Sequence, residues 1–320
     1  MTLVNLPNIE IHPVSEPSLH PYHLGASLYM PATRDVADML AVITRQKMPT
    51  LNTLILCLED AVSEPDVPMA MGNISTLLNQ LSQLSQQPTQ NRPLIFIRPR
   101  HPALLRQLAE LPQIGQIIGF VLPKVDMLTL PDWRLACQSL PSDLLLMPTL
   151  ETASVFNPYH NQELAMALTE AFSQTILALR IGGNDLMACL RLRRSKEVTL
   201  YDTPLGMLIY QLLGCFVPYG FYLTAPVFEY LDKPELMLAE LRHDVRLGLV
   251  GKTIIHPSQL EYVQEAFSVP KLEFEQAQAI LQQGAKAVFK HNNSMLEPAT
   301  HSEWARQILA RADVFGVQSY

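Results

Sequence analysis

Eight short apolar segments recur along this chain of 320 residues, and stretches with a helical pattern separate them. Continuously apolar segments are typical of strands covered on both faces, and strands that alternate with helices indicate a parallel sheet. Eight such units within roughly 250 residues predict an α/β fold, a (β/α)8 TIM barrel. An open doubly wound sheet is the alternative, but no glycine-rich GxGxxG turn follows an early segment. The expected strands cover residues 25–30, 53–58, 94–97, 119–122, 144–147, 176–181, 221–224 and 252–256.

Polar residues end or follow each of these segments. In a barrel the carboxyl ends of all strands meet at one face, which is where barrel enzymes keep their active sites. The sequence therefore predicts a ring of polar groups around one mouth of the barrel. In chain order, its members are Arg34, Glu59 with Asp60, Arg98, Lys124, Glu151, Asp185, Glu229 and His256.

Composition excludes several classes of protein. Charged residues make up 17% and hydrophobic residues 48%, which is typical of a globular chain, and a net charge of −7 disfavours nonspecific binding to nucleic acid or anionic membrane. The apolar stretch at residues 204–223 is interrupted by Gln211, Gly214 and Pro218, so we expect a buried helix and a turn there. The N-terminus does not have the pattern of a signal peptide, and the four cysteines form no CxxC pair. We expect a cytoplasmic protein.

A helical pattern continues after the eighth unit, where a barrel would already be complete. We therefore divide the chain into a barrel domain, residues 1–270, and a C-terminal helical extension, residues 271–320. The extension carries apolar stripes that need a surface to cover them. We expect it to act as a lid or as an oligomer contact. The stripes consist of Phe274, Ala277, Ile280 and Leu281 and, further on, of Trp304, Ile308 and Leu309.

Five short motifs carry a family resemblance. They are LEDAV at 58–62, LPKV at 122–125, ETA at 151–153, GxxDL at 182–186 and IHPSQ at 255–259. Each motif alone is weak, but here the five follow one another in the family's order on successive expected strands. The chain resembles the citrate lyase beta-subunit and malyl-CoA lyase family of magnesium-dependent carbon–carbon lyases.

The resemblance implies roles for particular residues. By position in the motifs, Glu151 and Asp185 are the Mg²⁺ ligands, with helix capping as the simpler alternative. Arg98 is the residue that binds a substrate carboxylate or enolate, and Glu59 and Asp60 lie beside the metal, where they orient water or ligands. These residue types suit the chemistry, because Mg²⁺ prefers oxygen ligands and a guanidinium stabilises developing negative charge. The family also implies a homo-oligomer, a trimer or hexamer, in which the C-terminal extension covers a neighbouring subunit's active site.

Three positions depart from the family pattern. A Pro31-Ala32-Thr33-Arg34 turn stands where relatives commonly have Pro-Gly, Asn184 precedes Asp185 in place of a glutamate, and Glu229 stands for an aspartate.

The expected function is aldol- or Claisen-type cleavage or condensation of a hydroxy acid, a 2-keto acid or an acyl thioester. The alternatives are a metal-binding barrel without turnover, and an aldolase that acts without CoA on a free or phosphorylated keto acid.

Further basic residues are candidates for substrate binding: Arg34, Lys124, Arg193, Arg194 and His256. Lys124 is expected to pair with a carboxylate, and a Schiff-base lysine is the alternative. His256 is either a catalytic base or the cap of the helix that follows it. The run of Arg191, Arg193 and Arg194 is either a solvated helix face or a site for the phosphate of CoA, a nucleotide or a sugar phosphate.

Overall fold

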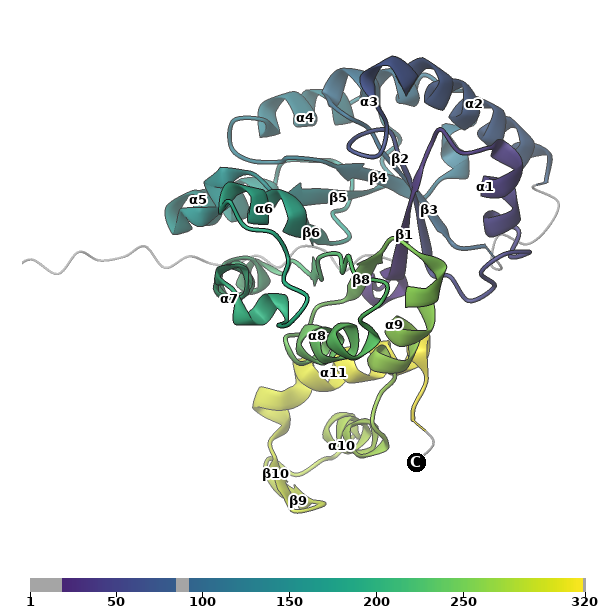
Figure 1. The fold of residues 1–320 in the computed structure, drawn as a ribbon. Helices are drawn as coiled ribbons and strands as arrows, with labels where there is room; N and C mark the ends of the chain where they lie inside the picture. The colour runs from purple at the N-terminus through teal and green to yellow at the C-terminus, as the bar shows by residue number, and fades with distance from the viewer. Residues whose placement is uncertain (1–18, 85–91, 319–320) are drawn as a thin grey trace, which may run out of the picture.

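The computed structural model describes residues 19–84 and 92–318, and its centre is a barrel of eight parallel strands (Figure 1). The strands are β1 (Gly25–Pro31), β2 (Thr53–Cys57), β3 (Leu94–Arg98), β4 (Gly119–Leu122), β5 (Leu145–Leu150), β6 (Leu179–Ile181), β7 (Leu223–Thr224) and β8 (Gly251–Ile254). Neighbouring strands follow the chain from β1 to β7, and β8 lies beside β1. Between β7 and β8 the Val250 N–H donates to the Leu223 carbonyl at 3.0 Å, and the Ala225 N–H donates to the Gly251 carbonyl at 2.8 Å. The (β/α)8 prediction is confirmed.

Helices follow the strands and cover the outside of the barrel; in Figure 1, α2 to α4 lie above the strands, α1 lies to their right, and α8 and α9 lie below them. Several helices begin at a proline, which suits the first helical position because its missing N–H has no intrahelical partner there. The helices are α1 (Val36–Ile43), α2 (Val67–Gln83), α3 (Pro102–Ala109), α4 (Leu130–Cys137), α5 (Pro158–Leu168), α6 (Gly183–Cys189), α7 (Pro204–Phe216), α8 (Pro234–Arg246) and α9 (Leu260–Phe267).

The apolar stretch at residues 204–223 forms the buried helix and turn that were predicted. It contains α7 and the turn Val217–Tyr219, followed by Gly220 with a left-handed φ of 88° and then by the start of β7. Within residues 19–84 and 92–318, no helix combines the length and the apolar character needed to cross a membrane.

Strand register decides which side chains face the barrel interior. Cα partners on parallel strands point to the same side of the sheet. Cys57 of β2 pairs with Arg98 of β3, and Arg180 of β6 pairs with Thr149 of β5 on one side and with Thr224 of β7 on the other. The guanidinium groups of Arg98 and Arg180 both lie over the ring of Tyr29 from β1. These positions therefore share the interior of the barrel.

The C-terminal extension forms a small core of its own. It consists of α10 (Lys271–Leu281), a hairpin of β9 (Phe289–His291) and β10 (Ser294–Leu296), and α11 (Pro298–Phe315). Ala277, Ile280 and Ile308 from the predicted stripes are buried in this core. Helix α11 packs on α9 and on the turn Pro21–Leu24, which immediately precedes β1. The extension therefore lies at the N-terminal end of its own barrel (Figure 1).

A cluster of buried charges joins β8 to α8. The Lys252 ammonium lies 2.8 Å from Glu240 Oε1 and 2.8 Å from Asp244 Oδ2, and all three side chains are fully buried. Arg194 lies 2.6 Å from Glu240 Oε2, and the Tyr201 hydroxyl donates to Asp244. Each buried carboxylate thus has a cation and further donors, as burial of charge requires.

Replacing Lys252 by Met is expected to lower the free energy of unfolding by about 3–5 kcal/mol, because two buried carboxylates would lose their shared cation. Urea denaturation measures this change. Lys47→Met is the matched control: it breaks an ion pair of 2.7 Å with Asp38, but both side chains are exposed, so stability should hardly change. Equal losses in the two variants would contradict a structural role for the buried cluster.

Candidate active site

The carboxyl ends of consecutive strands bring six charged side chains together at one mouth of the barrel. The strands are parallel, so their polar ends converge on one face although the residues are far apart in sequence. The cluster, called the mouth cluster below, consists of Glu59 and Asp60 after β2, Arg98 at the end of β3, Lys124 after β4, Glu151 after β5 and Asp185 on α6.

Arg98 lies at the centre of the mouth cluster. Its Nη2 atom is 2.9 Å from Glu59 Oε2, 3.1 Å from Glu151 Oε1 and 3.4 Å from Asp60 Oδ2. Burial by itself would lower the pKa of Arg98, but Tyr29, Glu151 and Glu59 outweigh it and hold the pKa above its ordinary value. The guanidinium therefore stays charged and fixes the positions of acids from two strands.

Lys124 adds a second cation. Its ammonium pairs with Glu59 and lies 3.6 Å from Asp60 Oδ1 and 3.8 Å from Asp185 Oδ1. Its backbone N–H donates to Glu151 Oε1 at 2.8 Å, and its φ of 53° is left-handed, which is uncommon for a residue other than glycine. Burial acts to lower the pKa of Lys124, but the hydrogen bond to Glu59 and the charges of the acids raise it. The structure thus gives Lys124 the ion-pair environment that the sequence favoured.

The neighbouring acids Glu59 and Asp60 differ in their surroundings. Glu59 is buried, and this burial, together with its hydrogen bond to Asp60, raises its pKa to about 7. Asp60 is about half exposed; burial acts to raise its pKa, but the bond to Glu59 and the charges of Arg98 and Lys124 lower it. Glu59 can therefore hold or release a proton near neutral pH, whereas Asp60 stays ionised.

Glu151 and Asp185 approach each other across the ends of β5 and β6. Burial raises the pKa of Glu151, and the charge of Asp185 raises it further, whereas Arg98 lowers it. Gly182 makes this approach possible, because a Cβ at that position would lie 2.3 Å from Glu151 Oε2. The glycine of the GxxDL motif is therefore required by the carboxylate beside it.

The mouth cluster has the charge of a site for a divalent cation. Four carboxylates, Glu59, Asp60, Glu151 and Asp185, face two cations, Arg98 and Lys124. Nowhere in the described part of the chain are three or more His, Cys, Asp or Glu side chains grouped to hold a metal. Mg²⁺ needs only one or two protein carboxylates, with water and substrate oxygens completing its coordination. Glu151 and Asp185 fit this requirement.

The other candidates lie in varied surroundings. Arg34 and Arg193 are exposed, and His256 uses Nδ1 to accept a hydrogen bond from the Ser258 N–H, which caps the turn Pro257–Gln259. Arg194 is buried and bound to Glu240 and the Val227 carbonyl, so its guanidinium is committed to the cluster behind β8.

Two of the positions that depart from the family pattern contact each other: the Asn184 side chain donates to Glu229 Oε1 at 3.0 Å.

Sequence reasoning missed two residues inside the barrel, Tyr29 and Arg180. Both faces of β6 are covered, and Arg180 is 2% exposed. A signal was present, because a single arginine interrupts the apolar segment at residues 176–181. A charge inside a buried strand needs a partner, and that requirement marks the position for attention.

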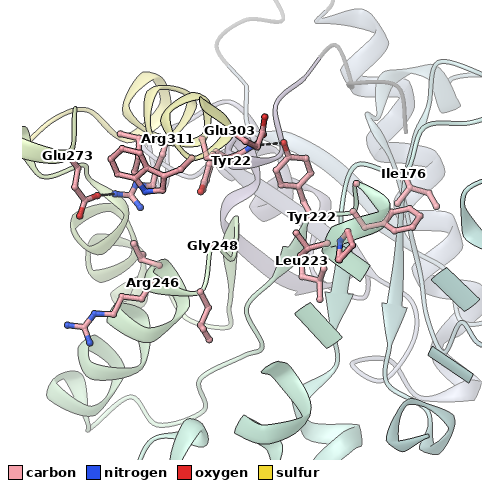
Figure 2. A pocket seen from close by; sticks show the side chains of 18 residues that line it. Tyr22, Ile176, Tyr222, Leu223, Arg246, Gly248, Glu273, Glu303 and Arg311 are labelled. Atoms are coloured by element: carbon pink, nitrogen blue, oxygen red, sulfur yellow. Dashed lines mark hydrogen bonds and ion pairs between the residues drawn. The ribbon is translucent and has the colours of Figure 1, made fainter. Parts of the chain in front are cut away.

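A cavity of about 680 Å³ lies at the other end of the barrel (Figure 2). Leu223 at the start of β7 and Tyr222 just before it form one wall, and Arg311 and Glu303 of α11 form another. Arg311 is paired with Glu273 at 3.2 Å. This cavity lies between part of the extension and the barrel, and no member of the mouth cluster lines it.

Comparison with known proteins agrees with this fold and site. The family model of C–C bond lyases of the TIM-barrel fold matches residues 18–317, whereas no curated protein matches the chain. A citrate lyase from Burkholderia xenovorans LB400 is 15% identical with a TM-score of 0.69, and 95% of each chain is covered. The CitE protein of Mycobacterium tuberculosis in complex with magnesium, acetoacetate and coenzyme A is 19% identical with a TM-score of 0.63, over 90% of this chain and 98% of that one.

A third solved structure is the citrate lyase beta subunit of M. tuberculosis complexed with oxaloacetate and magnesium. It is 18% identical with a TM-score of 0.54, over 77% of this chain and 98% of that one. At these identities the likeness shows a shared fold, and the family model, which spans nearly the whole chain, confirms the resemblance carried by the five motifs. The chain belongs to the family of C–C bond lyases with the TIM-barrel fold.

Proposed function

We propose that this protein is a Mg²⁺-dependent lyase that cleaves or forms a carbon–carbon bond beside a carbonyl group of a carboxylate-bearing substrate. The observation that carries the proposal is the excess of carboxylates over cations in the mouth cluster. Glu151 and Asp185 are the proposed metal ligands. Support also comes from the M. tuberculosis proteins, which were solved with magnesium and acetoacetate or oxaloacetate.

Each side chain of the mouth cluster has a separate proposed role in such a reaction. Bound Mg²⁺ supplies positive charge that polarises a substrate oxygen. Arg98 offers a planar guanidinium to a substrate carboxylate or to the enolate left when the carbon–carbon bond breaks. Glu59, with a pKa of about 7, holds or releases a proton at neutral pH. Lys124 keeps Glu59 and Asp60 in place through its ion pairs.

The substrate is a hydroxy acid, a 2-keto acid or an acyl thioester. Arg193 is exposed and remains our candidate for contact with a phosphate group, whether of CoA or of a phosphorylated substrate. Arg34 is also exposed and remains a candidate for substrate binding. We also propose a homo-oligomer, a trimer or hexamer, in which the C-terminal extension covers a neighbour's mouth. The position of α11 at the N-terminal end of its own barrel supports this arrangement, because the extension cannot cover its own mouth from there.

Replacing Glu151 by Gln is expected to weaken Mg²⁺ binding by at least about tenfold, because the change removes a charged oxygen ligand while keeping the shape of the side chain. Isothermal titration calorimetry of the full-length protein measures the affinity. Glu64→Gln is the control: it removes a carboxylate that follows a strand, β2, but one that is exposed and pairs with Arg100 at 3.3 Å. Unchanged Mg²⁺ binding by Glu151→Gln would refute the assignment.

The enolate chemistry has a test that does not require the full substrate. With Mg²⁺ in D₂O, the protein is expected to exchange the methyl protons of pyruvate or of an acetyl thioester for deuterium, followed by NMR. Arg98→Lys should slow this exchange and weaken ligand binding more than it weakens Mg²⁺ binding, because lysine lacks the planar two-pronged donor.

Two results would count against this proposal. Exchange with neither compound, in protein that has bound Mg²⁺, would favour a metal-binding barrel without turnover. Equal losses of ligand and Mg²⁺ binding in Arg98→Lys would show that Arg98 serves the fold instead of the substrate.

A further inference from the structure

A second buried arginine lies inside the barrel below the mouth cluster. Arg180 is 2% exposed; its Nη2 donates to Thr253 Oγ1 at 2.6 Å, and its Nη1 lies 3.8 Å from the sulfur of Met147. Its guanidinium carbon is 5.3 Å from the centre of the Tyr29 ring, and that of Arg98 is 5.8 Å from the same centre. Within residues 19–84 and 92–318, no carboxylate forms an ion pair with Arg180.

This cation lacks what buried charges normally have. Arg98 has three carboxylates and Lys252 has two, but Arg180 has a hydroxyl, a thioether and the face of an aromatic ring. A cation–π contact offsets part of the cost of burial, but it supplies no negative charge. The guanidinium therefore has capacity for an anion.

The strands beside Arg180 add hydroxyl groups that also lack partners. Thr149 and Thr224 are the Cα partners of Arg180 on β5 and β7, so all three side chains face the interior. Thr149 is 3% exposed and Thr224 is 1% exposed, and neither hydroxyl has a hydrogen-bond partner among the described residues. A guanidinium with hydroxyls on both flanks offers the donors that a carboxylate accepts.

The position of this group suits a ligand that also reaches the mouth cluster. Glu151 follows Thr149 by two residues, a step of roughly 6–7 Å along the strand direction, which a chain of about four carbon atoms spans at ~1.5 Å per bond. Tyr29 and Thr253 face the interior, yet both keep some exposure to solvent. Solvent therefore reaches part of the interior.

We infer that Arg180, with Thr149, Thr224 and Thr253, binds a second carboxylate of the substrate, so that the enzyme acts on a dicarboxylate. This inference rests on the proposed function. One carboxylate of the substrate, with its neighbouring hydroxyl or carbonyl oxygen, lies at Arg98 and the metal ligands, and the other lies deeper in the barrel at Arg180. Arg180 thereby selects diacids over acids that end in a methyl group.

Malate and 2-hydroxybutyrate test this selection, because they differ only in a carboxylate against a methyl group at the far end. Calorimetry is done with each enantiomer on the full-length, Mg²⁺-loaded protein. The native protein is expected to bind malate at least about tenfold more tightly, as a charged hydrogen-bonded pair provides. Arg180→Met should abolish this preference, while the affinities for 2-hydroxybutyrate and Mg²⁺ stay the same.

Two further variants keep the test decisive. Thr224→Val retains the side-chain shape and should weaken the binding of malate by a few-fold without changing the binding of 2-hydroxybutyrate. This variant tests the inference even if Arg180→Met does not fold. Arg106→Met on α3 removes one exposed positive charge and should change neither affinity.

A malate preference that survives in Arg180→Met, or equal losses for both acids in either pocket variant, would overturn the inference. The exchange of pyruvate protons involves only one carboxylate. If that exchange occurs while malate has no advantage in the native protein, the second-carboxylate site fails and the proposed function stands. Binding of neither acid by Mg²⁺-loaded protein would overturn both.

Discussion

The contact of one buried guanidinium with acids from two strands determines the arrangement of the mouth. Arg98 touches Glu59 and Glu151, which are both buried and would otherwise repel each other at a high desolvation cost. Lys124 extends the pairing to Asp60 and Asp185. The barrel makes these contacts possible, because parallel strands end at the same face whatever their separation in sequence. The negative charge left over after this pairing is the basis of the proposed metal site.

Residues at strand ends could be predicted from sequence, whereas residues within strands could not. An apolar run shows where a buried strand ends, so Glu59, Lys124 and Glu151 were found without any knowledge of their contacts. A strand covered on both faces shows no alternation of apolar and polar residues. The sequence therefore does not indicate whether Arg180 and Lys252 point into the barrel or out toward the helices. Arg194 shows the same limit: its partner Glu240 lies 46 residues away, and only the packing of α8 brings the two together.

Two cations buried in the wall of the barrel therefore have opposite roles. Lys252 faces outward to α8, where Glu240 and Asp244 of the same chain neutralise it. Arg180 faces inward, where its neighbours are Thr149, Thr224, Thr253 and the Tyr29 ring. The first arrangement is complete within the chain and belongs to stability. The arrangement around Arg180 offers hydrogen-bond donors but contains no anionic acceptor, as expected of a site that binds an anionic ligand.

The deeper part of the barrel interior is covered at its N-terminal end. Below Tyr29, the interior positions Ser27 and Thr53 are fully buried, and the turn Pro21–Leu24 with α11 against it covers the N-terminal end. A substrate whose far end reaches Arg180 must therefore arrive before any second organic substrate that covers the mouth above it, and it must leave last. If the substrate binds as inferred, geometry alone imposes an order on binding and release, and we expect the fragment held deepest to compete with the intact substrate as a product inhibitor.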